Sequence, residues 1–459
     1  MTFINRHKAQ AEAVVEETHA KFVSGSIMKH VIVMSLTASL GLIALFFVDL
    51  LDFYFISLLG ENNLAAAVGY AGTLLFFTTS VSIGLSIAMG ALVSKSLGAK
   101  DKHKAQEYGV AVSLFILATS IPITIGVWFG AEYLVALLGA SGETLELAVR
   151  YLKIVVLGMP LMSFSMGLNS ILRAMGDAKN SMMILLLASI VNGILDPILI
   201  FGFNLGLDGA AFATLCSRLA MFLGAIYFIG KGDFFAGVKY NFSKLWITLV
   251  PIVSIALPAI LTNLATPIGN AYVTRAIAQF GDSAVAGMSM IGRISPVAFA
   301  VIFALSGAIG PIIGQNLGAK KCDRVKQTVV NSIQFSTLYI LAISTVLFLF
   351  RNIIVDAFNL VGQARELGLL FLTILSWLFV FQAMVFVANA VFNNVGLAKK
   401  STIINFLKAT IFTMPFVYYG AQNYGASGVL YGQSIGSIFI GIIALWWCFR
   451  SINHVDKKA

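Results

Sequence analysis

Ser96-Leu97-Gly98-Ala99-Lys100 and Asn316-Leu317-Gly318-Ala319-Lys320 are two copies of one short loop, placed 220 residues apart in a chain of 459 residues. Two further pairs of segments repeat at nearly the same distance: Gly176-Asp177-Ala178-Lys179 with Gly396-Leu397-Ala398-Lys399, and Asn204-Leu205-Gly206-Leu207-Asp208-Gly209 with Asn423-Tyr424-Gly425-Ala426-Ser427-Gly428. Because the copies keep their order and spacing, we predict one structural unit that occurs twice.

The composition places this unit in a membrane. Hydrophobic residues make up 59% and charged residues 11% of the chain, and the apolar runs are too long for a soluble core. Windows of about 20 apolar residues predict an all-α integral membrane protein with twelve transmembrane helices, six in each half. The predicted spans are 30–59, 64–93, 107–130, 145–172, 181–203, 208–229, 247–278, 284–314, 327–350, 367–393, 401–421 and 427–449. Segment 131–140 is predicted to be a loop or to lie on the membrane surface.

Lysine and arginine predict the orientation of the spans. Of the 30 Lys and Arg residues, 22 fall in the two tails and in alternate loops, as the positive-inside rule requires of cytoplasmic segments. We therefore predict a multi-pass chain with both termini in the cytoplasm and no cleavable signal peptide. Its predicted parts are an amino-terminal tail (1–28), an N-lobe (29–230), a cytoplasmic linker (231–246), a C-lobe (247–450) and a carboxyl-terminal tail (451–459). The net charge of +10 follows from this topology, so no nucleic-acid partner is expected.

The even number of spans per half decides how the halves are related. Two six-helix bundles that enter the membrane from the same side are related by a pseudo-two-fold axis along the membrane normal. We expect a cleft between them, and an arrangement of this kind suits alternating access. A purely structural duplication is the alternative reading. Nothing in the chain predicts an oligomer, and we expect a monomer in the lipid bilayer.

Three acidic residues lie inside predicted spans, while the other 17 of the 20 lie in loops, tails or at span edges. They are Asp49 and Asp52 in the first span and Asp196 in the fifth. A charged Asp at the bilayer centre costs about 2.5–3.5 kcal/mol on insertion scales, so such residues mark an ion or proton path. At 1.5 Å per residue, Asp52 and Asp196 are both predicted to lie about 10–12 Å below the outer surface.

Polar residues on neighbouring spans reach a similar depth. Asn192 precedes Asp196 by one turn on the same helical face, and Tyr151 and Thr214 enter from the fourth and sixth spans. The predicted proton- or cation-binding residues are Asp52, Asp196, Asn192 and Asp49, with Tyr151, Thr214 and Arg218 as the supporting network.

Asp49 and Asp52 share a face of their helix because they are three residues apart. Two carboxylates in a poorly hydrated site disfavour joint ionisation, so we expect at least one to hold a proton near neutral pH. The alternative for Asp49 is a static ion pair with Arg218, which is predicted to lie at a similar depth on the sixth span.

The second half has no acidic residue in its spans, only Arg293 and Lys408. Lys408 is expected near the cytoplasmic end, where its side chain would snorkel to the surface. The rest of this half supplies an apolar wall rich in Phe, Met and Tyr, which suits aromatic or cationic substrates. Packing or lipid contact is the alternative role of any one of these residues.

Catalytic and metal motifs are missing from the sequence. The three cysteines, Cys216, Cys322 and Cys448, have no metal-like spacing and are expected to be reduced, structural thiols. Gly230-Lys231 lacks the Ser or Thr of a phosphate-binding loop. All five histidines lie in tails, loops or at a span edge, so no enzyme, metal site or cofactor is predicted.

Five segments resemble the multidrug and toxic compound extrusion (MATE) transporters, and the resemblance extends over nearly the whole chain. They are Asp52–Ala66, Leu172–Lys179, Asn192–Pro197, Gly209–Thr214 and Arg293–Gln327. The pattern is similar to the DinF-like, proton-coupled branch, since the acids that the sodium-coupled branch carries on its seventh and tenth spans are missing here.

The resemblance implies an antiporter of the bacterial inner membrane that exports organic cations or amphipathic drugs in exchange for protons. It implies Asp52 and Asp196 as the proton-linked carboxylates and H⁺, rather than Na⁺, as the coupling ion. The alternatives are a flippase for lipid-linked saccharides and a sodium-coupled drug exporter. One departure is Thr37, which stands where members often have a proline at which the first span bends. Bending is then expected at Gly41 or through the hydroxyl groups of Ser35, Thr37 and Ser39.

Overall fold

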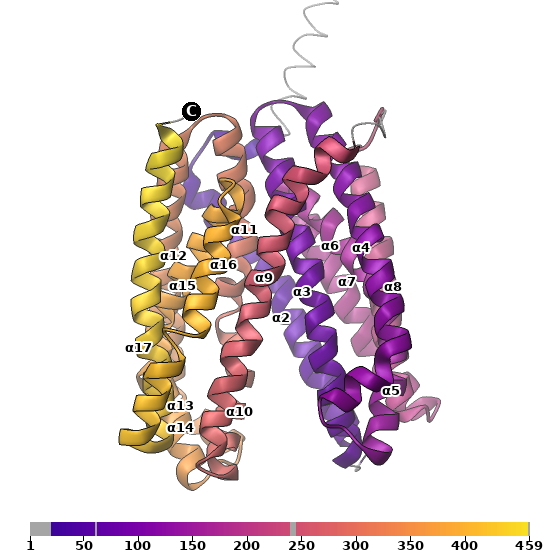
Figure 1. Ribbon diagram of the computed structural model, residues 1–459, viewed down its shortest axis with the longest axis vertical. Helices are drawn as coiled ribbons and strands as arrows, with labels where there is room; N and C mark the ends of the chain where they lie inside the picture. Colours follow the sequence, from indigo (N-terminus) through magenta and orange to yellow (C-terminus); the bar gives the residue numbers. More distant parts are fainter. Residues whose placement is uncertain (1–19, 60–61, 239–244, 458–459) are drawn as a thin grey trace, which may run out of the picture. The chain divides into compact units, whose positions relative to one another are not determined.

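The computed structural model describes residues 20–59, 62–238 and 245–457, which fold into helices joined by short connections. They form two compact units (Figure 1). Most of the predicted amino-terminal tail (1–19), Gly60, part of the predicted linker (239–244) and the last two residues lie outside the described residues.

Unit 1 holds the described residues between Leu40 and Ile260. It contains the later part of helix α2 (Ile27–Ser57) and the earlier part of α9 (Leu245–Ala278). Between them lie α3 (Asn62–Gly98), α4 (Lys102–Leu137), α5 (Gly142–Val156), α6 (Met159–Ala174), α7 (Ala178–Pro197), the π-helix η2 (Ile198–Gly202) and α8 (Gly206–Lys231). Helix α3 packs against α4, α5 and α6, and α7 packs against α8.

Unit 2 holds Ala20–Ser39 and the described residues from Leu261 onward. It begins with the 3₁₀ helix η1 (Lys21–Val23) and the first part of α2. It continues with α10 (Asp282–Ala298), α11 (Ala300–Gly318), α12 (Cys322–Leu349), α13 (Arg351–Ala357), α14 (Gly362–Thr373), η4 (Leu375–Leu378), α15 (Phe379–Asn394), α16 (Ala398–Ala409) and α17 (Met414–Asp456). Helix α15 packs against α11, α12, α16 and α17.

The units divide two of the predicted spans. The predicted lobes begin at residues 29 and 247, whereas the units assign Ala20–Ser39 to unit 2 and the start of α9 to unit 1. The physical reason is that hydrogen bonds hold the segment before α2 to unit 2 and the segment after α8 to unit 1. The lobe boundaries themselves stay a prediction.

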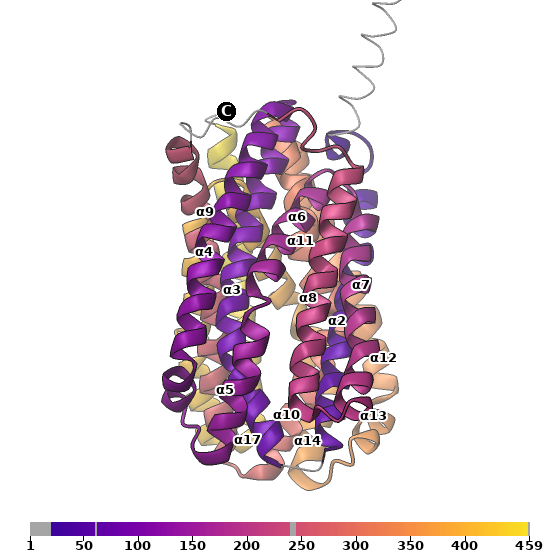
Figure 2. The same ribbon diagram turned by 90° about the vertical axis from the view of Figure 1, so that its right-hand side faces the viewer.

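Ten helices in the described part are long and apolar enough to span a membrane, and eleven if the pair α5 and α6, bent by 44°, is counted as one span. Helix α5 lies in the lower and α6 in the upper part of unit 1 (Figure 2). Each of the twelve predicted spans falls on one helix or on a broken pair such as α10–α11 or α14–α15. The smaller count arises because neither α5 nor α6 alone is long enough to be counted, and because α16 and α17 are counted together.

At two places a helix continues further than the predicted span. Segment 131–140 is neither wholly a loop nor a separate surface segment, since α4 continues without interruption to Leu137 and buries Ala131 and Val135. Helix α17 continues to Asp456, so most of the predicted carboxyl-terminal tail (451–459) is helical. In both places no residue interrupts the helix where the apolar pattern weakens, so the backbone hydrogen bonds continue.

The repeated loops are left-handed turns that end helices. Lys100 and Lys320 have φ of 61° and 58°, and Gly176 and Gly396 have φ of 78° and 79°. The following amide closes each turn: Asp101 N donates to Ser96 O and Lys321 N to Asn316 O at 3.0 and 2.8 Å. These are the hydrogen bonds of a helix C-cap, so the repeats encode matched helix ends.

The third repeat places glycine where two helices meet. Gly206 and Gly425 have positive φ, and Gly209 and Gly428 follow them by three residues. A Cβ at Gly428 would lie 2.0 Å or less from Gly420 O, and Gly432 and Gly436 approach Phe416 and Phe412 in the same way. The two parts of α17 therefore fold back on each other at Gly425 as a tight antiparallel pair.

The segment before α2 is tied to unit 2 through its backbone. Phe22 N donates to Gln315 Oε1 at 2.8 Å, and Asn316 Nδ2 and Arg324 Nη2 donate to Phe22 O. Arg324 also donates to the carbonyl oxygens of Ser24 and Gly25. In unit 1, Gln106 Nε2 donates to Phe234 O at 2.6 Å, which holds the segment after α8 in a similar way.

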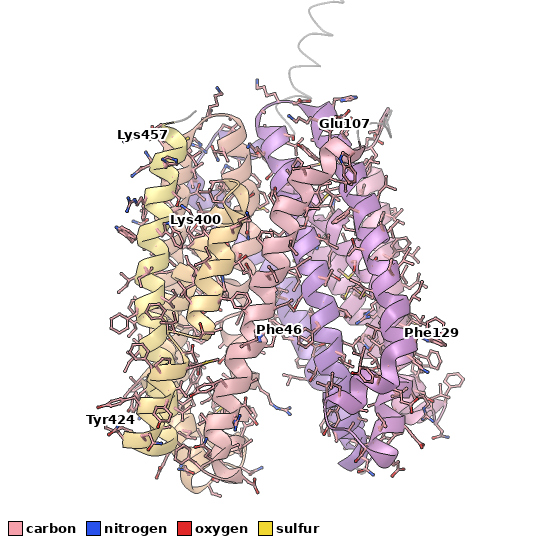
Figure 3. All side chains as sticks on the ribbon, viewed as in Figure 1. Phe46, Glu107, Phe129, Lys400, Tyr424 and Lys457 are labelled. Carbon is pink, nitrogen blue, oxygen red and sulfur yellow. The ribbon has the colours of Figure 1, made fainter. Side chains whose placement is uncertain are left out.

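Large apolar side chains cover the outer surfaces of the helices. Phe129 on α4 is 77% exposed and Tyr424 on α17 is 68% exposed, and Figure 3 shows both pointing away from their units. Apolar exposure of this extent is compatible with lipid and not with water. All three cysteines are free, with Cys322 and Cys448 buried and Cys216 exposed.

Candidate functional site

Helices α2 and α7 run in parallel and bring Asp52 beside Asp196. A Cβ at Gly41 would touch Leu185, and a Cβ at Gly193 would lie 3.7 Å from Val48. From the first contact to the second, the chain advances by seven residues on α2 and by eight on α7, so the two helices run in the same direction. One further turn along both helices leads to Asp52 and Asp196. Their carboxyl groups lie within hydrogen-bonding reach of one another.

The carboxyl pair contains buried atoms without partners. Within residues 20–59, 62–238 and 245–457, Asp52 Oδ1, both carboxyl oxygens of Asp196 and Asn192 Nδ2 are buried and have no hydrogen-bond partner. Two ionised carboxyl groups offer only acceptors, so neither can satisfy the other. A single proton turns one of them into a donor, and the pair can then form a hydrogen bond.

Tyr151 and Thr214 adjoin this pair. The Tyr151 side chain is buried, its hydroxyl lies within hydrogen-bonding reach of Thr214, and it interacts electrostatically with both Asp52 and Asp196. Asn192 lies on the face of α7 that carries Asp196, one turn earlier. The structure thus brings together the five residues that depth along the helices placed in one layer.

Arg218 and Asp49 do not form the ion pair that was one reading of the sequence. Arg218 Nη1 donates to Val155 O at 2.7 Å, at the end of α5. In the described part of the chain no ion pair includes Asp49, whose side chain is exposed and interacts electrostatically with Asp52. Arg218 therefore supports the bend between α5 and α6, while Asp49 lies one turn from the carboxyl pair.

Sequence reasoning missed two features. The contact of Arg218 with a backbone carbonyl has no signature in the side chains of the sequence. The second is a bond in unit 2 from Lys408 Nζ to Gln382 Oε1. Its signal was available, because Lys408 is an ionisable residue in a half that has no acid in its spans.

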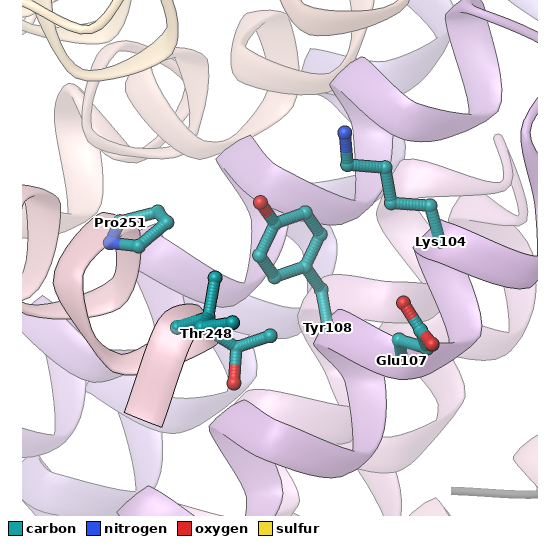
Figure 4. A pocket seen from close by; sticks show the side chains of 6 residues that line it. Lys104, Glu107, Tyr108, Thr248 and Pro251 are labelled. Carbon is teal, nitrogen blue, oxygen red and sulfur yellow. The ribbon is translucent and has the colours of Figure 1, made fainter. Parts of the chain in front are cut away.

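A cleft of about 330 Å³ opens elsewhere in unit 1, between the starts of α4 and α9 (Figure 4). It is lined by Lys104, Glu107, Tyr108, Ile247, Thr248 and Pro251. Asp52 lies near the far end of α2, and α2 and α4 both begin on the side that the sequence predicts to be cytoplasmic. The cleft is therefore separate from the carboxyl pair and takes no part in its chemistry.

The sequence matches a family model described as MatE over residues 38–198 and 258–419. A protein of Shewanella oneidensis named "FAD transporter" is 29% identical over 440 residues, which cover 94% of this chain and 97% of that protein. "Multidrug export protein MepA" of Staphylococcus aureus is 25% identical over 435 residues, covering 92% of this chain and 94% of that one.

Solved structures have the same fold. An outward-facing multidrug resistance MATE family transporter of the MOP superfamily superposes with a TM-score of 0.90 at 24% identity, over 96% of this chain and 99% of that chain. The Vibrio cholerae MATE transporter VcmN superposes with a TM-score of 0.87 at 25% identity, over 93% of this chain and 97% of that one.

Proposed function

Since the chain belongs to the MatE family, the multidrug and toxic compound extrusion transporters, we propose that it is a proton-coupled antiporter that exports small amphipathic organic compounds by alternating access. The observation that carries the proton coupling is the pair Asp52 and Asp196, whose buried oxygens lack partners and face each other. Organic cations and drugs are among the compounds expected from the sequence.

The pair acts by changing its charge. With both groups ionised, the site attracts a cation and repels a second negative charge; with one proton bound, the two groups hold each other through a hydrogen bond. Asn192 and Tyr151 can serve either form, because an amide and a hydroxyl each contain a donor and an acceptor. The proton and the exported compound can shift the transporter between states only by binding those states unequally.

Helix α2 provides a place for such a shift. It lacks the expected proline, and Thr37 takes that position within an unbroken helix. Ser39 Oγ donates to Leu36 O at 2.8 Å, and a hydroxyl bond of this kind bends helices. The change from unit 2 to unit 1 follows at Leu40, which supports a proposed bend between Ser39 and Gly41.

The nature of the cargo and of the membrane belongs to this proposal. MepA is named a multidrug exporter and the Shewanella protein a FAD transporter, so relatives of similar length are named for different cargoes. We propose the bacterial inner membrane with cytoplasmic termini, a monomer, and the DinF-like branch. Sodium coupling remains the rival mechanism and a lipid-linked saccharide flippase the rival function.

The test is ethidium transport by inside-out vesicles that contain the parent, Asp52→Asn or Asp196→Asn, driven by either a proton or a sodium gradient. We expect each substitution to lower proton-driven transport on the order of tenfold or more, because the coupled carboxyl is gone. Asp208→Asn is the control, since Asp208 forms a surface ion pair with Arg150 at 2.7 Å. Parent-like transport by both variants would overturn the proton site, and transport driven by sodium alone would favour the rival mechanism.

A further inference from the structure

Lys408 does not snorkel as predicted. It lies ten residues after the start of α16 at Ala398, about 15 Å along the helix. Its Nζ donates to Gln382 Oε1 on α15, and Gln382 is twelve residues before the end of that helix, about 18 Å from the same side. The ammonium group is therefore directed toward the middle of the membrane, beside the break between α16 and α17.

This cation has a neutral partner. The predicted spans of the second half contain no Asp or Glu, and no ion pair of Lys408 occurs among the residues that the structure describes. A side-chain amide can accept one hydrogen bond from the ammonium group but cannot neutralise its charge. Ionisable residues at this depth are costly and mark the path of a substrate or ion.

A row of polar side chains, the polar seam, lies between α15 and α16 and ends at Lys408 and Gln382. Its other members are Asn389, Ser401 and Asn405. Ser401 Oγ and Asn405 Nδ2 donate to Asn389 Oδ1 at 2.8 and 3.0 Å, all within the core of unit 2. Ser401, Asn405 and Lys408 are spaced to share one face of α16, and Gln382 and Asn389 share the facing side of α15. Lys408 and Gln382 thus form the end of the seam that lies deepest in the membrane.

Comparison of the two halves shows which polar residues of the seam have a polar counterpart in the first half and which do not. At the repeat distance of 220 residues, Asn389 corresponds to Asn169 and Ser401 to Ser181. Lys408 corresponds to Ala188 and Gln382 to Met162. Asn389 and Ser401 therefore have polar counterparts in the first half, while Asn405 corresponds to Leu185. Apolar residues also suffice for packing at the positions of the cation and the amide.

Aromatic rings accompany the pair on α15. Phe379 and Phe386 lie one turn before and one turn after Gln382 on the same face. Phe379 stacks on Phe299 with ring centroids 4.0 Å apart, and Phe303 contacts both Phe379 and Phe386. Phe303 keeps 36% of its surface exposed, so part of this cluster is open to a ligand.

We propose that Lys408 and Gln382 bind an anionic group of the exported compound, and that Phe303 and Phe386 hold its aromatic part. The exported compounds then include aromatic carboxylates, sulfonates or phosphates beside the organic cations. The inference rests on the proposed export function and adds this class to its cargo. It divides the chemistry between the halves: the first binds the coupling proton, and the second binds the negative charge of the cargo.

The test uses two dyes that share a xanthene ring and differ in charge, the anion carboxyfluorescein and the cation rhodamine 123. Fluorescence anisotropy measures their binding to the purified full chain in uncharged detergent, without a gradient. For Lys408→Met we expect carboxyfluorescein to bind about ten- to hundredfold more weakly, with little change for rhodamine 123. Lys408→Arg keeps the charge and should retain most of the affinity.

Gln382→Glu is the second variant, because it adds a carboxylate beside Lys408 without removing the lysine. It should weaken carboxyfluorescein binding as Lys408→Met does. Unchanged affinity of both variants, or no binding of the anion by the parent, would overturn the proposal. If phosphatidylglycerol binds in a manner that depends on Lys408 while the dye does not, Lys408 holds a lipid headgroup and the proposal fails.

The arm that tests the proposed function is separate. Asp52→Asn should bind carboxyfluorescein in detergent at least as well as the parent, and should fail only in gradient-driven transport. Loss of proton-driven transport with intact Lys408-dependent binding supports both statements. Parent-like transport by Asp52→Asn with Lys408-dependent binding would overturn the proton coupling alone.

Discussion

Among individual residues, Gly158 shows how a small side chain sets the geometry near the carboxyl pair. Its φ of −78° is open to any residue, so its role is to leave space and not to permit a turn. A Cβ there would lie 2.5 Å from Arg218 Cδ and 3.1 Å from Leu215 Cδ1. The guanidinium group that holds Val155 O would have to move.

Gly158→Ala is therefore expected to lower the free energy of unfolding by about 1–3 kcal/mol, as overpacking does. The measurement is thermal unfolding of the purified protein in detergent. Gly126→Ala on α4 is the matched control, because a Cβ at Gly126 meets no atom within 4 Å. An equal effect of the two substitutions would show that the space beside Arg218 is not the cause.

Residue by residue, the sequence predicted which side chains lie together better than it predicted the contacts around them. The depth of Asp52 and Asp196 could be read from their distance to the ends of their spans, because helices advance by a fixed rise. The hydrogen bonds of Arg218 and Lys408 could not be read from the sequence in this way. One joins a backbone carbonyl. The other lies beside the break after Ala409, for which Pro415 in the first turn of α17 is the local sequence signal.

Among the helices, breaks and ends carry most of the information. The pairs α5–α6, α10–α11 and α16–α17 are each interrupted, and hydropathy alone predicted single spans there. Hydropathy averages over about 20 residues and cannot resolve the interruptions of one, two and four residues found here. The repeated loops at Lys100 and Lys320 coincide with helix ends, where both lysines take the left-handed conformation.

Arg324 connects helix α12 to the segment before α2, and its removal should loosen that segment. Arg324→Gln loses the bonds to the carbonyl oxygens of Phe22, Ser24 and Gly25. We expect amide hydrogen exchange in residues 22–25 to accelerate about tenfold, the worth of one charged hydrogen bond. Mass spectrometry of the exchanged peptides measures it.

Lys326→Gln is the control for that experiment, because Lys326 pairs with Asp456 at 2.9 Å and has no bond to this segment. Exchange in residues 22–25 should then match the parent. Equal exchange in Arg324→Gln and the parent would mean that Gln315 and Asn316 hold the segment without help.

For the whole molecule, duplication explains the architecture and divergence explains the chemistry. Each unit contains the matched helix ends. The acidic residues inside predicted spans all lie in the first half, whereas Lys408 lies in a span of the second half. The fold class followed from composition and from the repeats. The division into units did not, because the bonds of Gln315 and Gln106 join segments that are far apart in the sequence.

The predicted orientation can be tested with single cysteines in a chain that carries Cys216→Ala, Cys322→Ala and Cys448→Ala. Lys102→Cys and Val361→Cys both lie at exposed positions, on opposite predicted sides. A membrane-impermeant maleimide should label Val361→Cys in intact cells and Lys102→Cys only in inside-out vesicles. Labelling of both positions from one side would contradict the topology derived from the positive charges.

Lys100 and Lys320 adopt a backbone conformation that glycine would occupy with less strain, since a left-handed residue with a Cβ costs about 1–2 kcal/mol. Both copies keep the cation nevertheless. The two turns thus combine backbone strain with an exposed positive charge. On the predicted topology, each half then has its own lysine to orient it in the membrane.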